Sequence, residues 1–257
     1  MSLVTRPALD ELRDICQPDA TMDRRNGEHW LARRWLRRVS LRITAVLVRT
    51  PVKPNQLTAL MIVVGLMAAG AAALPGLVWA LATAALVLGY FILDLCDGEV
   101  ARWKNMTSVT GVYLDRVGHY IVEAALLIGY GFRAGGQEVG GWTTLGCLGA
   151  LFVVLVKSET DLVDTVRTRA GMAAATDDRA ELRDNQIGRL RRAASVLRIH
   201  QMTGALESAG LLVVVATIDA VAGGLAATQA MVVFLVAVSG VMVILHLASI
   251  LLSRRLQ

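Results

Sequence analysis

Residues 94–120, DLCDGEVARWKNMTSVTGVYLDRVGHY, decide how this chain folds. The stretch holds three aspartates, two arginines and a histidine, yet uncharged and largely apolar segments flank it, at residues 54–93 and 124–132. A charged side chain in the middle of a membrane costs roughly 2.5 to 3.5 kcal/mol on insertion scales. The stretch therefore predicts a site in which binding partners offset that cost.

The composition of the chain is that of an integral membrane protein. Its 257 residues are 55% hydrophobic and only 18% charged, and the mean hydropathy is +0.54. A chain with this composition is too apolar to be a soluble domain of this length. The formal net charge is +5, and in a membrane protein such an excess marks surfaces that face the cytoplasm and anionic lipids. We therefore expect the lipid bilayer as a partner and no nucleic acid.

The apolar segments predict an all-α fold with six membrane-spanning helices. A span of roughly 18 residues rises ~27 Å, close to the ~30 Å of a bilayer core. Pro75 and Gly76 divide the uncharged residues 54–93 into two such spans. The third span is expected to begin near Ser108. The last three are expected at residues 139–156, 205–218 and 230–252.

The distribution of basic residues predicts the orientation of these spans. Lysine and arginine accumulate in short cytoplasmic loops of membrane proteins. All but Arg116 and Arg133 of the 26 lysines and arginines fall on one side of a six-span chain. They lie in residues 1–56, 102–104, 157–198 and 254–255. We therefore expect a multi-pass protein of the cell membrane, with both termini and residues 94–120 on the cytoplasmic side.

The chain is expected to have three parts. Residues 1–25 form a cytoplasmic tail, residues 26–53 an amphipathic helix, and residues 54–253 the six-helix domain, with a charged linker at about 171–200. The amphipathic helix has an apolar stripe and an opposite basic stripe. The apolar stripe is Leu31, Trp35, Val39, Ile43, Val46 and Leu47, and the basic stripe is Arg33, Arg34, Arg37 and Arg38. Such a helix lies flat among lipid headgroups; a solvated helix that packs on a partner is the alternative.

The spacing of polar residues in 94–120 predicts a metal site. Asp94 and Asp97 are three residues apart at the end of the second span, so both carboxylates project from one helical face. Asp115 and His119 are four apart and share a face of the returning helix. If the two helices face each other, three carboxylates and an imidazole gather, and the carboxylates repel one another unless a cation binds. Hard oxygen ligands favour Mg²⁺ or Mn²⁺.

The residues beside these carboxylates indicate a substrate that carries a pyrophosphate. The guanidinium group of Arg102 is a fixed fork of donors that suits phosphate. Gly98 and Ala101 leave backbone accessible next to the carboxylates.

The same residues resemble the motif of the CDP-alcohol phosphotransferase family, D-x2-D-G-x2-A-R-x8-G-x3-D-x3-D. Seven of its eight fixed positions match in type and spacing. They are Asp94, Asp97, Gly98, Ala101, Arg102, Gly111 and Asp115. The segment KPNQLT, residues 53–58, is also similar to the Pro-Asn-Thr pattern that this family has before its first span. The resemblance covers about residues 26–250.

The resemblance implies an enzyme of phospholipid or related biosynthesis. An acceptor hydroxyl attacks a CDP-alcohol, often CDP-diacylglycerol, and CMP is released. The resemblance also implies a homodimer and two divalent ions, which stabilise the entering and leaving oxygens of a phosphoryl transfer. The implied metal ligands are Asp94, Asp97 and Asp115, to which His119 is added at the last motif position. The implied CDP-alcohol contacts are Asn55, Thr58, Asp94, Gly98, Ala101, Arg102 and Gly111.

The chain departs from the motif at its eighth position, where His119 replaces the aspartate to which the family assigns the role of general base. An imidazole can remove a proton near neutral pH, and it can bind metal with a preference shifted toward manganese or zinc. Glu123, one turn further, can orient the imidazole or stand in as the carboxylate. If His119 is only a packed residue, the base role returns to Glu123 or Asp115.

Basic residues after the fourth span are candidates for acceptor binding. The segment VRTRAGM, residues 166–172, resembles the Arg-x-Arg-Ala stretch of phosphatidylinositol-phosphate synthases. Arg167 and Arg169 would clamp the phosphate of a phosphorylated polyol such as inositol phosphate, or else act as positive-inside anchors. Lys157 borders the same approach.

Two other functions are compatible with the sequence, a catalytically inactive scaffold of the same fold and a transporter. Charges inside a membrane also mark transport paths. Here most of the charged residues are expected to cluster at the cytoplasmic end of two spans, which favours the transferase.

Overall fold

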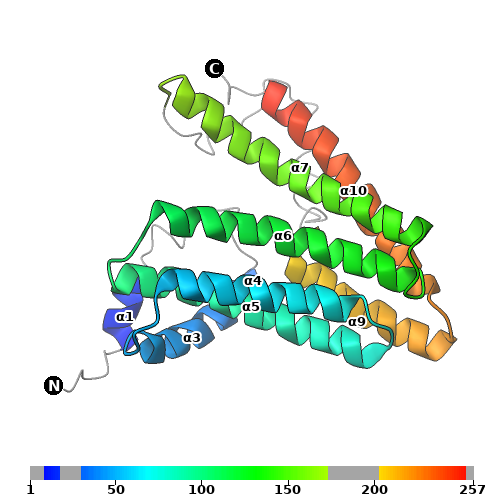
Figure 1. The fold of residues 1–257 in the computed structure, drawn as a ribbon, viewed down its shortest axis with the longest axis horizontal. Coiled ribbons are helices and arrows are strands. Elements are labelled where there is room, and N and C mark those ends of the chain that lie inside the picture. The colour runs from blue at the N-terminus through cyan, green and yellow to red at the C-terminus, as the bar shows by residue number, and fades with distance from the viewer. Residues whose placement is uncertain (1–8, 18–29, 173–202, 253–257) are drawn as a thin grey trace. The chain divides into compact units, whose positions relative to one another are not determined.

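The computed structural model of the chain describes residues 9–17, 30–172 and 203–252 (Figure 1). Their regular structure is helical, without strands, which confirms the predicted all-α class. The helices are α1 (Leu9–Cys16), α3 (Trp30–Leu47), α4 (Pro54–Ala72), α5 (Leu77–Trp103), α6 (Val109–Ala134), α7 (Gly141–Arg169), α9 (Ala205–Ala222) and α10 (Ala226–Leu252). The predicted cytoplasmic tail thus contains a helix. Residues 173–200 of the predicted charged linker lie outside the described residues.

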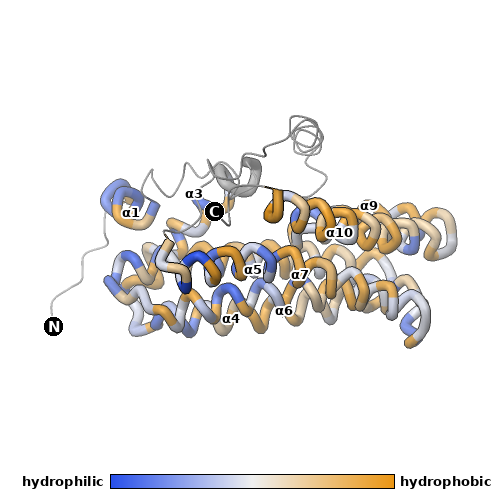
Figure 2. The backbone as a smooth tube through the Cα atoms, turned by 90° about the horizontal axis from the view of Figure 1, so that it is seen from above, coloured by the Kyte–Doolittle hydropathy of each residue, from blue (hydrophilic) through white to orange (hydrophobic). Residues whose placement is uncertain are grey.

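Five of the described helices, α4, α5, α7, α9 and α10, are long and apolar enough to cross a membrane. In Figure 2, α9 and α10 are hydrophobic along most of their length. Helix α6, the third of the six predicted spans, is not among the five, since its charged and polar residues lower its hydropathy. The helices support a multi-pass membrane protein. The sixth span and the orientation stay predictions.

The chain divides into two compact units. The first unit is Met1–Met67 with Ala85–Ile121, and the second is Ala68–Ala84 with Val122–Gln257. The division crosses α4, α5 and α6, so each of these helices contributes residues to both units. Residues 94–120 all belong to the first unit, whereas the predicted acceptor residues belong to the second.

In the first unit, α3 packs on α1. A small core joins the two helices, made of Leu12, Cys16, Leu41 and Ala45. The stripe of α3 that is buried also includes Arg37, Ser40 and Thr44, so it coincides with neither predicted stripe. Trp35 is 74% exposed and Val46 is 55% exposed; their contact with lipid headgroups stays a prediction. The side chains of Leu31, Arg33 and Arg34 lie outside the described residues.

Gly118 allows α6 to approach α4 closely. A Cβ atom at this position would lie 2.7 Å from Cγ1 of Ile62 and 3.0 Å from Cε of Met61. Because those distances are shorter than normal packing contacts, the approach requires a residue without a side chain. Gly118 lies between Asp115 and His119, so the approach helps to place both of these residues.

In the second unit, α4 and α5 are joined at the predicted Pro75-Gly76 turn. Gly76 has a φ of +86°, which glycine adopts without strain. Arg133 of α6 is buried and binds this turn, with hydrogen bonds from Nη1 to the carbonyl oxygen of Leu74 at 2.6 Å and from Nη2 to that of Gly76 at 3.1 Å. Helices α7 and α9 both pack on α10.

Candidate functional site

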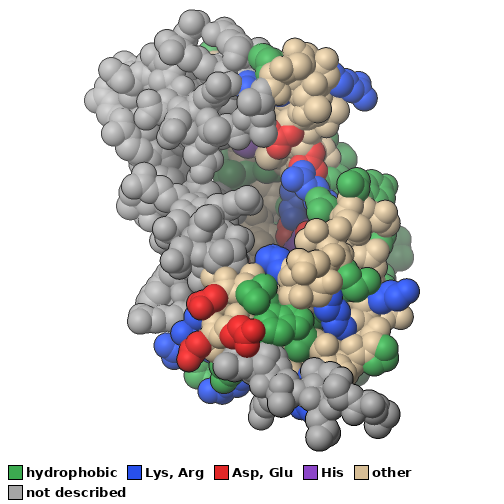
Figure 3. All heavy atoms as spheres, turned by 90° about the vertical axis from the view of Figure 1, so that its left-hand side faces the viewer, with side chains coloured by type: hydrophobic (Ala, Val, Ile, Leu, Met, Phe, Trp, Pro, Cys, Tyr) green, Lys and Arg blue, Asp and Glu red, His purple; other side chains and the backbone are tan. Residues whose placement is uncertain are grey.

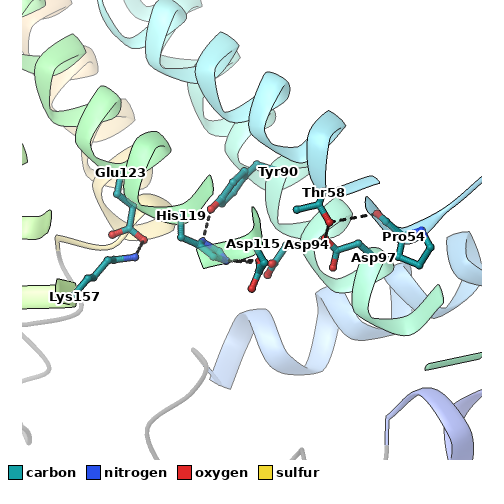
Figure 4. Close-up of polar contacts among 9 residues, drawn as sticks. All are labelled: Pro54, Thr58, Tyr90, Asp94, Asp97, Asp115, His119, Glu123 and Lys157. Atoms are coloured by element: carbon teal, nitrogen blue, oxygen red, sulfur yellow. Dashed lines mark hydrogen bonds and ion pairs between the residues drawn. The ribbon is translucent and has the colours of Figure 1, made fainter. Parts of the chain in front are cut away.

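Asp94, Asp115 and His119 form the centre of the candidate site (Figure 4). Their ligand atoms all lie within 4.8 Å of one another. Nε2 of His119 is 3.2 Å from Oδ1 of Asp94 and 3.4 Å from Oδ1 of Asp115. Asp94 comes from α5 and the other two residues from α6. The structure thus brings together three of the four predicted metal ligands.

The donor set of this group fits a hard divalent cation. Two carboxylates and one imidazole are ligands that Mn²⁺ accepts, and carboxylates are those that Mg²⁺ prefers. Oδ1 of Asp115 is buried and makes no hydrogen bond. Its contact with Nε2 of His119 at 3.4 Å is an ion pair only when the imidazole is protonated. A buried oxygen without a hydrogen bond is unfavourable, and a cation held by Asp94 and Asp115 would satisfy it. These residues can therefore hold a metal ion.

Asp97 lies outside this group of three and is held by α4. Oγ1 of Thr58 donates a hydrogen bond to its Oδ2 at 2.6 Å, and Asp97 is largely buried. The sequence predicts Thr58 as a contact of the CDP-alcohol, but the structure shows it as the partner of a carboxylate. Metal binding by Asp97 stays a prediction.

Tyr90 is a residue of the site that the sequence analysis missed. Its side chain is fully buried, and its hydroxyl group forms a hydrogen bond with Nδ1 of His119 (Figure 4). This contact fixes the imidazole ring so that Nε2 points at Asp94. A signal was present in the sequence, because Tyr90 lies one helical turn before Asp94 and places a hydroxyl group on the same side of an apolar span.

Glu123, which the sequence predicts as the orienting partner of His119, forms an ion pair with Lys157 in the second unit. Its Oε1 lies 2.8 Å from Nζ of Lys157. The pair joins α6 to α7, and each charge compensates the other. A catalytic role for Glu123 and an acceptor role for Lys157 stay predictions.

The two motif glycines leave room for polar side chains in the first unit. A Cβ atom at Gly98 would lie 3.3 Å from Nη1 of Arg102, and one at Gly111 would lie 3.0 Å from Oδ1 of Asn55. Four of the predicted CDP-alcohol contacts are thus arranged as two neighbouring pairs. Ala101, a fifth, is partly buried. Charged side chains of both signs lie on the surface shown in Figure 3.

The structure separates the two predicted acceptor arginines. Arg167 is fully buried, whereas Arg169 is exposed. Residues two positions apart on an α-helix point to different faces. The two guanidinium groups therefore do not lie side by side at the end of α7.

Comparison with known proteins adds two findings. The sequence profile of the family described as CDP-alcohol phosphatidyltransferase matches residues 52–221, more than half of the chain. A segment of 96 residues, 36% of this chain, is 34% identical to a protein of Archaeoglobus fulgidus named bifunctional IPC transferase and DIPP synthase. The matched region spans 18% of the length of that relative.

Proposed function

This chain belongs to the CDP-alcohol phosphatidyltransferase family, and from that premise we propose that it transfers a substituted phosphate group from a CDP-alcohol to an acceptor hydroxyl and releases CMP. The observation that carries the proposal is the group of Asp94, Asp115 and His119 at motif positions of two neighbouring helices. We take CDP-diacylglycerol as the first donor to test. The A. fulgidus relative, which is named as a transferase, supports the reaction class.

In the proposed reaction, the acceptor oxygen attacks the phosphorus atom that carries the alcohol. The bond from that phosphorus to the CMP oxygen breaks, CMP leaves with the electron pair, and a base takes the acceptor proton. His119 is the proposed base, since its Nδ1 is held by Tyr90 and its Nε2 points toward the carboxylates of the site. Asp94 and Asp115 would hold the divalent ion, with Asp97 as a further ligand. When bound, such an ion neutralises phosphate charge and stabilises the leaving oxygen.

The proposed CDP-alcohol contacts are the pairs beside the two motif glycines. The Nη groups of Arg102 lie next to Gly98, where they can donate to a diphosphate. Asn55 lies next to Gly111 in the same way and offers an amide to the nucleotide. The short side chain of Ala101 leaves room for the nucleotide at this surface.

The test of this function is the release of CMP by the purified full chain. CDP-diacylglycerol and other CDP-alcohols are offered with free and phosphorylated polyols in the presence of Mg²⁺ or Mn²⁺. We expect CMP release with at least one pair. A folded protein that binds metal but releases no CMP with any pair would favour the inactive scaffold, and transfer of an unchanged solute across vesicles would favour the transporter.

We propose a phosphorylated polyol such as inositol phosphate as the acceptor. Arg169, which is exposed, would contact its phosphate directly, whereas Arg167, which is buried two residues away, would contribute its positive charge. Loss of charge-assisted hydrogen bonds worth about 1.5 to 3 kcal/mol corresponds to roughly 10- to 100-fold. Replacing both arginines by alanine is expected to raise the KM for a phosphorylated acceptor by that factor, with nearly unchanged affinity for the CDP-alcohol. The measurement is steady-state CMP release at varied concentrations of each substrate.

The single variants distinguish the contributions of the two arginines, because only Arg167 is buried. Arg169→Ala is the milder change and leaves the packing of α7 intact. Thermal unfolding in detergent controls for loss of structure in Arg167→Ala. An equal loss for donor and acceptor would contradict the acceptor role.

We further propose a homodimer in the cell membrane with its active site on the cytoplasmic side. The distribution of lysine and arginine supports the orientation, and the family supports the dimer.

A further inference from the structure

A buried carboxylate lies behind the motif, at Glu99. Its side chain is fully buried and accepts three hydrogen bonds from residues that precede α4. Oε1 accepts from Nε2 of Gln17 at 2.7 Å and from Oγ of Ser40 at 2.8 Å, and Oε2 accepts from Oγ1 of Thr44 at 2.7 Å. A buried carboxylate is tolerated only when such donors compensate for lost hydration. The burial of the Glu99 carboxylate therefore depends on donors from Gln17, which follows α1, and from α3.

The backbone of the same part of α5 is tied to α1 as well. The carbonyl oxygen of Glu99 accepts a hydrogen bond from Sγ of Cys16 at 3.3 Å. Burial raises the pKa of Cys16 to about 11, with a smaller contribution from the charge of Glu99, so the thiol stays protonated and can donate. In return, Nε of Arg102 donates to the carbonyl oxygen of Cys16 at 2.7 Å.

A third tie follows at the end of α5. Nζ of Lys104 donates to the carbonyl oxygens of Thr50 and Val52 at 2.7 and 2.8 Å. Residues 99–104 are therefore held at successive positions by Cys16, Gln17, α3 and the segment between α3 and α4. All these residues belong to the first unit.

The tie at Glu99 lies on a different face of α5 from Asp97. Asp97 and Glu99 are two residues apart, so their side chains project to different sides of the helix. Asp97 is held by Thr58 of α4, whereas Glu99 is held by Gln17 and α3. Cys96, which lies one turn before Glu99 on the same face, is fully buried, and its Sγ donates to the carbonyl oxygen of Ser40 of α3 at 3.6 Å. The last turns of α5 are thus fixed from two sides.

We propose that Glu99 is a positioning residue, which locks the metal-binding end of α5 to α1 and α3 and thereby sets the affinity of the site for its divalent ion. Its carboxylate does not touch the group of Asp94, Asp115 and His119, so it acts through the rotation and position of α5. The inference rests on the metal centre of the proposed function.

The test compares Glu99→Gln with a matched control, Asp219→Asn, in the full-length chain purified in detergent. Asp219 is also a buried carboxylate with three hydrogen bonds, from the amides of Ala227 and Thr228 at 2.8 and 3.0 Å and from Oγ1 of Thr228 at 2.6 Å. Asp219 lies in the second unit, whereas the metal group and its ties belong to the first, so Asp219→Asn makes the same chemical change outside the first unit. The measurements are the Kd for Mn²⁺, from the electron paramagnetic resonance of free Mn²⁺, and the midpoint of thermal unfolding.

Both variants are expected to unfold at a lower temperature, but only Glu99→Gln is expected to raise the Kd for Mn²⁺, by about tenfold, the lower end of what supporting groups of metal ligands contribute. The double variant Ser40→Ala, Thr44→Val removes two of the donors and keeps Glu99. It is expected to weaken Mn²⁺ binding in the same direction, and to add less than its full effect when combined with Glu99→Gln.

Wild-type affinity for Mn²⁺ in the Glu99→Gln variant would overturn the positioning role, as would equal weakening by Asp219→Asn. If Glu99→Gln does not fold, wild-type affinity in the Ser40→Ala, Thr44→Val variant overturns it instead. Wild-type protein that binds no Mn²⁺ would overturn the proposed metal centre and this inference together. The two failures are therefore distinguishable.

Discussion

Replacing Asp94 by asparagine is expected to lower the rate of CMP release by about 1,000-fold or more and to weaken the binding of Mn²⁺. The carboxylate of Asp94 contacts His119 and lies close to Asp115. A metal ion contributes several kcal/mol to the stabilisation of transition-state charge, and each ~1.36 kcal/mol is tenfold in rate. Asparagine keeps the shape of the side chain but removes the charge that holds the ion.

The measurements for this variant are CMP release and Mn²⁺ affinity at the same metal concentration. Asp219→Asn is the control, because it removes a buried carboxylate of the second unit. Chelation of divalent ions from the wild-type protein should abolish CMP release, and added Mg²⁺ or Mn²⁺ should restore it. Activity that survives chelation, or an Asp94→Asn variant with normal turnover, would contradict the metal centre.

Replacing His119 by glutamine is expected to lower turnover by about 100- to 10,000-fold, the usual contribution of a general base, with little change in CDP-alcohol affinity. Glutamine can still form hydrogen bonds to Tyr90 and Asp94 but cannot accept the proton of the acceptor. His119→Asp should retain substantial activity, because it restores the residue of the family motif. Tyr90→Phe should cost less, about tenfold, since it removes only the contact that orients the ring.

Turnover measured together with Mn²⁺ affinity separates the two roles open to His119. If the imidazole is the base, His119→Gln loses turnover and keeps Mn²⁺ affinity. If it is a metal ligand, both fall together. Near-normal turnover of His119→Gln would make this residue a bystander and would return the base role to Glu123 or Asp115.

The sequence alone determined the all-α class, the apolar segments and the family. These depend on properties that are local along the chain, namely hydropathy and the spacing of residues on one helix. Asp94 and Asp97 share a face because three residues make nearly one turn, and seven motif positions match at fixed intervals. No knowledge of neighbouring helices is needed for either statement.

Only the tertiary structure decided which side chains meet across helices. Tyr90, rather than Glu123, holds Nδ1 of His119, Thr58 holds Asp97, and Gln17, Ser40 and Thr44 surround Glu99. The rotation of a helix about its axis is set by packing against its neighbours, as at Gly118, where α6 approaches α4. A polar residue in an apolar segment therefore indicates that the folded chain supplies it with a hydrogen-bond partner. The identity of that partner depends on packing between segments that are distant in the sequence.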